Sequence, residues 1–263
     1  MKGDSSGILS PQSRPSISYG YARAEKDVIS VTAAGGQLYC ASPKGITDEF
    51  FNCPVYRPSQ NHLRIMSVCS THRVIVFTEM NTRNNDISVK LLSRSTWLLV
   101  WEEPTILTTF QRADNSVVRV AVFGNMITAI DPLKRELMTF NTTNHQKVVF
   151  PLNWMGKPNG IHMLSADSIL VVDHNYHTVT KLNLHTDGST EVLWTCEDIT
   201  KPSGIRTDKS GLIYVASYTK NMVYILSSNG KSSASMKLFS FYTENNNNNL
   251  SLFIYRLMKS ASR

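Results

Sequence analysis

Two stretches in the second half of the chain repeat each other at a fixed distance. Residues 157–161 (KPNGI) recur 44 positions later as residues 201–205 (KPSGI). The apolar run 169–173 (ILVVD) then aligns without a gap on residues 213–217 (IYVAS). Each unit is a Pro-Gly turn followed by three short apolar runs that polar turns separate. Such runs, rich in β-branched and aromatic residues, are typical of β-strands.

The second run of the unit also occurs nearer the N-terminus. Residues 36–42 (GQLYCAS) match residues 211–217 (GLIYVAS) at a distance of 175 positions, which is four periods of about 44. Similar runs at 73–79 and 126–131 fill the interval. Five units are therefore recognisable, and one polar residue ends the run in each of them: Ser42, Glu79, Asp131, Asp173 and Ser217.

A period of about 40–50 residues with four strands indicates a β-propeller, because a single four-stranded blade cannot bury both of its faces and a ring of neighbours covers them. Helical repeats are disfavoured because no stretch shows apolar residues at 3.6-residue spacing over a helix length. We therefore expect an all-β chain with five recognisable blades, in a five- or six-bladed ring that is closed or left open. Four tryptophans are expected to fill the space between blades: Trp97, Trp101, Trp154 and Trp194.

The unit at 201–230 resembles an NHL repeat, and the unit at 157–185 shares its pattern. The resemblance lies in a Pro-x-Gly-Ile start, a Gly-Leu-Ile-Tyr-Val-Ala-Ser strand at 211–217 and a closing Asn-Gly. It implies a propeller like those at the C-terminus of tripartite-motif ubiquitin ligases, which bind partner proteins or RNA. The chain shows no ring-finger cysteine–histidine pattern, B-box or coiled-coil heptads. The resemblance thus implies a non-catalytic module for target recognition or scaffolding in a ubiquitination pathway.

Residues 158–161 (PNGI) also resemble a segment of gluconolactonase-like propeller hydrolases. That resemblance implies that Asn159 would help to hold a divalent cation, which activates water as a Lewis acid. The corresponding positions in two other units carry Ser203, where that family places Asp, and Val117, which cannot ligate a metal. We therefore expect a chain that is not an enzyme and holds no cofactor. A metal-dependent hydrolase is kept as an alternative.

Propeller topology places the Pro-x-Gly turns and the turns after the second strands on one face of the ring. The turns at 165–168 and 208–211 are expected on the opposite face. Cations mixed with Tyr and His suit a protein partner as well as single-stranded RNA, which such surfaces bind by charge and by stacking of bases. The predicted binding residues are Lys134, Arg135, Lys157, Asn159, His174, Asn175, Tyr176, His177, Lys201, Tyr218, Lys220 and Asn221.

Two of these residues, His174 and His177, share a turn with Asp173, but a zinc site needs further ligands that nothing in the sequence places beside them. Asp173 is instead expected to bind the backbone of its own turn. We predict a protein partner, with RNA as the second hypothesis, and no small-molecule substrate.

The charge of the chain is distributed unevenly along its length. The net charge is +7, and its whole excess lies in residues 201–263, which carry nine Lys and Arg against Asp208 and Glu244. No signal peptide and no run of about 18 apolar residues occurs, so we expect a cytoplasmic protein without a membrane segment. The predicted divisions are a disordered segment at 1–16, a propeller at 17–242 and an irregular Asn-rich basic tail at 243–263. Residues 18–31 are a candidate for a strand that closes the last blade.

Overall fold

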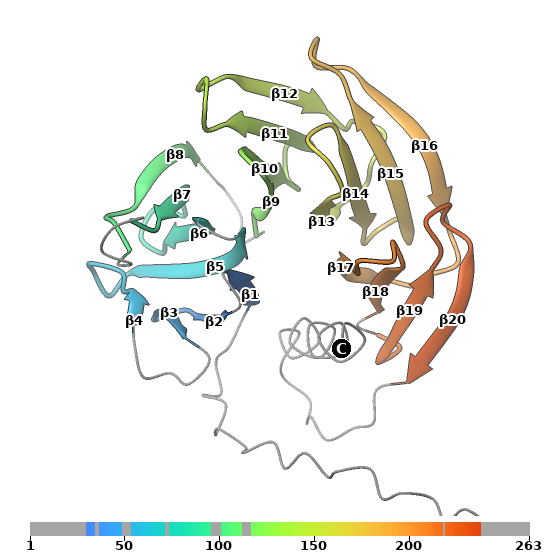
Figure 1. The fold of residues 1–263 in the computed structure, drawn as a ribbon, viewed down its shortest axis with the longest axis horizontal. Helices are drawn as coiled ribbons and strands as arrows, with labels where there is room; N and C mark the ends of the chain where they lie inside the picture. Colours follow the sequence, from blue (N-terminus) through green and yellow to red (C-terminus); the bar gives the residue numbers. More distant parts are fainter. Residues whose placement is uncertain are drawn as a thin grey trace, which may run out of the picture.

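The computed structural model describes residues 30–34, 37–48, 54–71, 74–95, 101–111, 117–217 and 219–237. Within these ranges all regular secondary structure is β-strand. The strands form five four-stranded antiparallel sheets, which are arranged around a common centre as the blades of a propeller (Figure 1). The predicted fold class is confirmed, with five blades in the described part of the chain.

Each blade consists of four strands that follow one another in the sequence and pair as antiparallel neighbours. The first strand of each blade lies nearest the centre of the ring (Figure 1). In blade order, the strands are β1 (Ser30–Ala34), β2 (Gln37–Ser42), β3 (Gly45–Asp48) and β4 (Pro54–Tyr56); β5 (Leu63–Ser70), β6 (Val74–Asn81), β7 (Ile87–Ser93) and β8 (Thr105–Phe110); β9 (Arg119–Phe123), β10 (Met126–Asp131), β11 (Glu136–Asn141) and β12 (Lys147–Pro151); β13 (Pro158–Met163), β14 (Ser168–Asp173), β15 (Thr178–Leu184) and β16 (Thr190–Cys196); β17 (Pro202–Thr207), β18 (Ile213–Ser217), β19 (Met222–Leu226) and β20 (Ser232–Lys237).

The pairing register confirms the predicted repeat at the level of single residues. Pro158 pairs with Asp173 in blade 4, and a β-bulge follows it. Pro202 pairs with Ser217 in blade 5 and is also followed by a bulge. In blade 2, Glu79 likewise pairs with a residue that precedes a bulge. A bulge adds one residue to one strand and increases the local twist, so these blades share one irregularity as well as one strand order.

The hydrophobic core is divided among the junctions between blades. Strand β14 shows why, because all of its residues except the first are buried. Ile169 and Val171 pack in a cluster with residues of blade 3, whereas Leu170 and Val172 pack in a cluster with residues of blade 5. Successive side chains of a strand point to opposite faces, so a strand between two neighbours is apolar on both. This arrangement explains the continuous apolar runs in the sequence.

Neighbouring blades also meet through their innermost strands. Strand β5 contacts β1 and β9, and β13 contacts β9 and β17. No comparable contact joins β17 to β1 among the described residues, and Figure 1 shows these two strands on either side of a wider interval. The described blades therefore form an arc of four packed junctions.

Two tryptophans occupy the predicted positions between blades, and one does not. Trp101 lies edge-on to Tyr39 of blade 1, with their ring centroids 5.6 Å apart. Trp194 of β16 packs in the cluster between blades 4 and 5. Trp154, in contrast, is 44% exposed on the link between blades 3 and 4, so its prediction as a packing residue is wrong. Trp97 lies outside the described residues.

Several predictions concern the ends of the chain. Residues 1–16, the boundary at 242 and the tail at 243–263 lie outside the described residues, and their predictions stay untested. Of the candidate closing segment 18–31, the part that is described belongs to β1, which pairs with β2 in the first blade. No helix of the described part is long and apolar enough to cross a membrane.

Candidate interaction surface

Three connections between strands and the last residue of a fourth lie on one face of blades 3 to 5, which we call the loop face. They are the turn at 132–135 between β10 and β11, the link at 152–157 between blades 3 and 4, the turn at 174–177 between β14 and β15, and the residue Lys201 that precedes β17. Backbone hydrogen bonds connect them: the Leu152 amide donates to the Arg135 carbonyl at 2.7 Å, and the His174 amide to the Lys157 carbonyl at 3.0 Å. The turn of blade 3, the link and the turn of blade 4 are therefore joined to one another through their backbones.

Asp173 fixes the centre of this surface. Its side chain is fully buried at the end of β14. One carboxylate oxygen, Oδ1, accepts hydrogen bonds from the amides of Asn175 at 2.8 Å and Tyr176 at 3.0 Å, as predicted for a residue that binds its own turn. It also accepts the amide of Lys157 at 3.0 Å, and Oδ2 accepts that of Gly156 at 2.5 Å. Asp173 therefore holds the turn and the link between blades together.

Arg135 connects the turn of blade 3 to the same link. Its backbone has a φ of 54°, in the left-handed region that non-glycine residues seldom adopt. Its Nη1 donates to the carbonyls of Asn153 at 3.2 Å and Met155 at 3.3 Å, which flank Trp154 in the chain. The guanidinium group thus secures the backbone on both sides of this tryptophan.

Three large apolar side chains are exposed along the connected segments. Leu133 is 48% exposed in the turn of blade 3, Trp154 44% on the link and Tyr176 59% in the turn of blade 4. The ring of Tyr176 lies against Gly156, where an added Cβ would approach its Cε1 to 3.2 Å. We call these three residues the apolar patch. Exposed large apolar side chains on one face are a feature of interaction sites when they form a common patch.

Two histidines of the turn have different surroundings. Nδ1 of His177 accepts a hydrogen bond from the Lys201 amide at 2.9 Å, which ties blade 4 to blade 5. Nδ1 of His174 is buried and has no hydrogen-bond partner. Burial lowers the pKa of His174 below its ordinary value of 6.5, while a hydrogen bond with the backbone of Pro202 acts against this shift. His174 is therefore neutral at pH 7.

The remaining predicted residues divide into three groups. Lys134 lies exposed beside the apolar patch, and Lys220 and Asn221 lie exposed on the corresponding turn of blade 5. Asn159 is placed differently, at the bulge of β13, where its carbonyl accepts a hydrogen bond from Arg119 Nε at 3.2 Å. Tyr218 lies outside the described residues.

Sequence analysis missed two members of the surface, Leu133 and Trp154. An apolar residue in a turn has no periodic signal, and a tryptophan in a propeller is assigned to the core by default. The position of Trp154 in the sequence could have indicated its exposure, because it precedes the turn at Lys157 by three residues. It therefore lies on the link between blades and outside the strand pattern.

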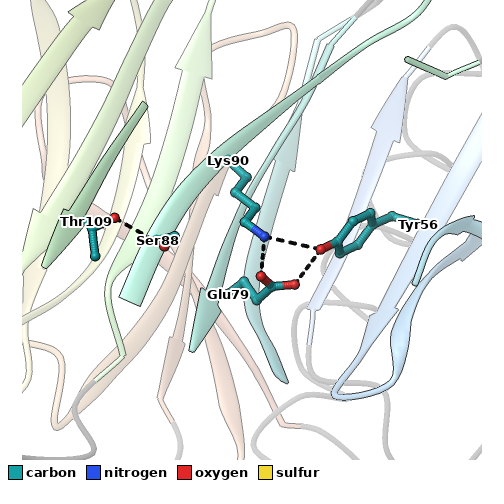
Figure 2. A network of polar contacts seen from close by, with 5 residues as sticks. All are labelled: Tyr56, Glu79, Ser88, Lys90 and Thr109. Carbon is teal, nitrogen blue, oxygen red and sulfur yellow. Dashed lines mark hydrogen bonds and ion pairs between the residues drawn. The ribbon is translucent and has the colours of Figure 1, made fainter. Parts of the chain in front are cut away.

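In blade 2, the position that corresponds to Asp173 is occupied by Glu79. Lys90 Nζ donates a hydrogen bond to one carboxylate oxygen of Glu79, and the hydroxyl of Tyr56 donates to the other at 2.5 Å. Figure 2 shows the three side chains converging from blades 1 and 2. Burial, and then the hydrogen bond to Glu79, raises the pKa of Tyr56. The charges of Glu79 and Lys90 thus neutralise each other at a junction between blades.

The metal site of the hydrolase alternative would need several ligands close together. No group of three or more His, Cys, Asp or Glu side chains that could hold a metal ion occurs within the described ranges. In blade 2 the residue at the bulge is Met66, and β9 of blade 3 is paired without a bulge. The position of Asn159 is thus not repeated as a set of oxygen ligands.

Comparisons with known proteins support the fold alone. No family model and no curated protein matches the chain, so the resemblance to NHL repeats is not confirmed. A solved structure of a protein of unknown function from Bacteroides caccae has a TM-score of 0.58 at 13% identity, over 80% of this chain and 81% of that one. A functionally unknown protein from Desulfotomaculum acetoxidans DSM 771 has a TM-score of 0.55 at 12% identity, over 81% of this chain and 70% of that one.

Proposed function

We propose that the chain is a non-catalytic interaction module that binds a protein partner through the loop face of blades 3 and 4. The observation that carries the proposal is the apolar patch of Leu133, Trp154 and Tyr176 on connections that Asp173 and Arg135 fix in place. A surface that is already ordered loses little conformational entropy on binding. Trp and Tyr are also among the residues that contribute most to protein interfaces.

The cations around the patch indicate the chemistry of the partner. Lys134, Lys157 and Lys201 are exposed on the same connected segments, and no ion pair involving them occurs among the described residues. A partner that presents apolar side chains surrounded by Asp or Glu would complement this surface. Complementary charge at the rim speeds association more than it raises affinity.

An RNA ligand is the second hypothesis, and two features make it the weaker one. Leu133 offers no ring on which a base can stack, although aromatic stacking is the main sequence-tolerant contact with single strands. Arg135 donates to two backbone carbonyls with Nη1 and is partly committed to the protein itself. The patch therefore has fewer free groups for bases and phosphates than its composition suggests.

The test compares capture of partners from the native extract by three immobilised versions of the chain. The wild type is compared with W154S/Y176S and with V192S/L193S, a matched control whose apolar side chains are 49% and 44% exposed on β16. We expect to capture a protein that binds the wild type and the control equally well. Its affinity for W154S/Y176S should be at least tenfold lower, because a hot-spot side chain contributes about 2 kcal/mol or more.

Treatment of the extract with ribonuclease separates the two hypotheses. Capture that survives the treatment supports a protein partner, and capture that depends on intact RNA supports the second hypothesis. Equal capture by W154S/Y176S and the wild type would contradict both, since both place the ligand on the loop face.

A further inference from the structure

Two arginines extend from neighbouring blades to the innermost strand of blade 4. Arg119 of β9 donates through Nε to the carbonyl of Asn159, at 3.2 Å. Arg206 of β17 donates through Nη1 to the carbonyl of Ile161, at 3.4 Å, and to that of Ile205, at 2.9 Å. Strand β13 lies between β9 and β17 and is the first strand of its sheet. The two guanidinium groups therefore approach its unpaired inner edge from both sides.

These two positive charges lie close enough to affect each other. Burial and, as the smaller cause, repulsion from Arg206 together lower the pKa of Arg119 to about 10. Neither arginine forms an ion pair with a carboxylate in the described part of the chain. Two partly desolvated like charges without a counter-charge are unfavourable, and the usual remedy is an anion or an acidic side chain.

The guanidinium groups also keep unused donors. A guanidinium has five N–H groups; toward the described residues, Arg119 uses one of them and Arg206 uses those on Nη1. Arg119 and Arg206 are both intermediate in exposure, between the buried and the exposed residues of the described part. Paired N–H donors of this kind match the two oxygens of a carboxylate or a phosphate.

The neighbouring polar groups do not compete for this role. His162 of β13 shares a hydrogen bond of 2.8 Å between its Nε2 and the hydroxyl of Thr207. Burial, and then the charge of Arg206, lowers the pKa of His162 to about 3. The imidazole is thus neutral at pH 7 and supplies no counter-charge to the two guanidinium groups.

We propose that Arg119 and Arg206 form a binding site for a small oxyanion, an inorganic phosphate or a carboxylate, at the inner edge of β13. The site lies on the innermost strands and does not include the apolar patch, so it does not depend on the proposed protein partner. A bound oxyanion would neutralise the two guanidinium groups and link blades 3, 4 and 5 at the centre of the arc.

The experiment measures thermal unfolding of the full chain in phosphate, in malonate and in chloride at one ionic strength. A ligand that binds only the folded state raises the melting temperature. We expect phosphate or malonate at millimolar concentration to raise the Tm of the wild type by several degrees over its value in chloride. A larger increase in phosphate indicates a phosphate ligand, and a larger increase in malonate indicates a carboxylate. The matched control is R83Q, which removes an exposed arginine from the turn after β6.

The variant R206Q should lose this increase, whereas R83Q should keep it. Because R206Q also removes two backbone hydrogen bonds, R206K is a second variant that retains the charge without the planar fork. We expect its affinity for the effective ion, measured by calorimetry, to be at least fivefold weaker than that of the wild type. The proposal is overturned if neither ion raises the Tm above chloride, if R206Q gains as much as R83Q, or if R206K binds as tightly as the wild type.

Discussion

Replacing Asp173 with Asn changes one atom in the group that organises the loop face. The amide oxygen of Asn can take the place of Oδ1 and keep the contacts with Lys157, Asn175 and Tyr176. The amide nitrogen then replaces Oδ2 and faces the Gly156 N–H, whose nitrogen lies 2.5 Å from that oxygen. Two donors would meet there, so one charge-assisted hydrogen bond is lost and the other three lose the negative charge.

The expected cost is about 2–3 kcal/mol, since a hydrogen bond to a charged group contributes roughly 1.5–3 kcal/mol. For domains of roughly 150–250 residues, each kcal/mol lowers the Tm by about 2–4 °C. We therefore expect D173N to melt about 4–12 °C below the wild type. Urea unfolding followed by tryptophan fluorescence should show a lower midpoint with an unchanged slope.

The matched control is D187N in the turn between β15 and β16. Asp187 also accepts the amide two residues later, from Ser189 at 2.8 Å, but its side chain is exposed and a single oxygen makes its contacts. D187N should leave the Tm nearly unchanged. Equal stability of D173N and D187N would refute the role given to Asp173 as the residue that joins the turn to the link between blades.

Three further predictions test the junctions between blades and the inner edge. K90M should lower the free energy of unfolding by about 3 kcal/mol because it removes the counter-charge of the buried Glu79 carboxylate, which then keeps, among the described residues, only the hydrogen bond from Tyr56. E79Q/K90M should recover most of this loss in urea unfolding, and a double variant as unstable as K90M would contradict the pairing. G160A should cost about 1–3 kcal/mol in the same assay, because its Cβ would lie 2.7 Å from the carbonyl oxygen of Ser203, and wild-type stability would show that the two innermost strands can separate. Burial and then the charge of Arg206 lower the pKa of His162 from 6.5 to about 3, so the unfolded chain takes up its proton first and stability should fall as the pH drops below 6.5. H162Q should show a shallower decline between pH 6.5 and 4, and an identical decline would contradict the buried neutral state.

The strand order and the repeat could be predicted from the sequence because each blade must bury two faces. That requirement imposes apolar runs with turns at fixed distances, and the positions of Asp173 and Ser217 follow from the 44-residue period. The weaker units were harder to delimit because their strands differ in length. Strand β4 has 3 residues, whereas β5 and β6 have 8 each.

The candidate site could be predicted only in part. Topology places turns on a common face, and so the positions of Arg135, Lys157 and Tyr176 follow from the repeat. Which turn residues are exposed depends on tertiary contacts, such as those of Arg135 with the backbone around Trp154. No periodic pattern encodes these contacts. The same holds for Arg119, whose partner Asn159 lies 40 residues away in the neighbouring blade.

The proposal of a protein-binding loop face is tested most directly by photo-crosslinking in the native extract. In one version of the full chain, a photoreactive amino acid replaces Tyr176. In a second version it replaces Ala166, which is exposed in the turn between β13 and β14 on the opposite face. The account predicts a specific protein adduct from position 176 and none from position 166. An adduct from position 166 alone would contradict it and place the partner on the other face of the propeller.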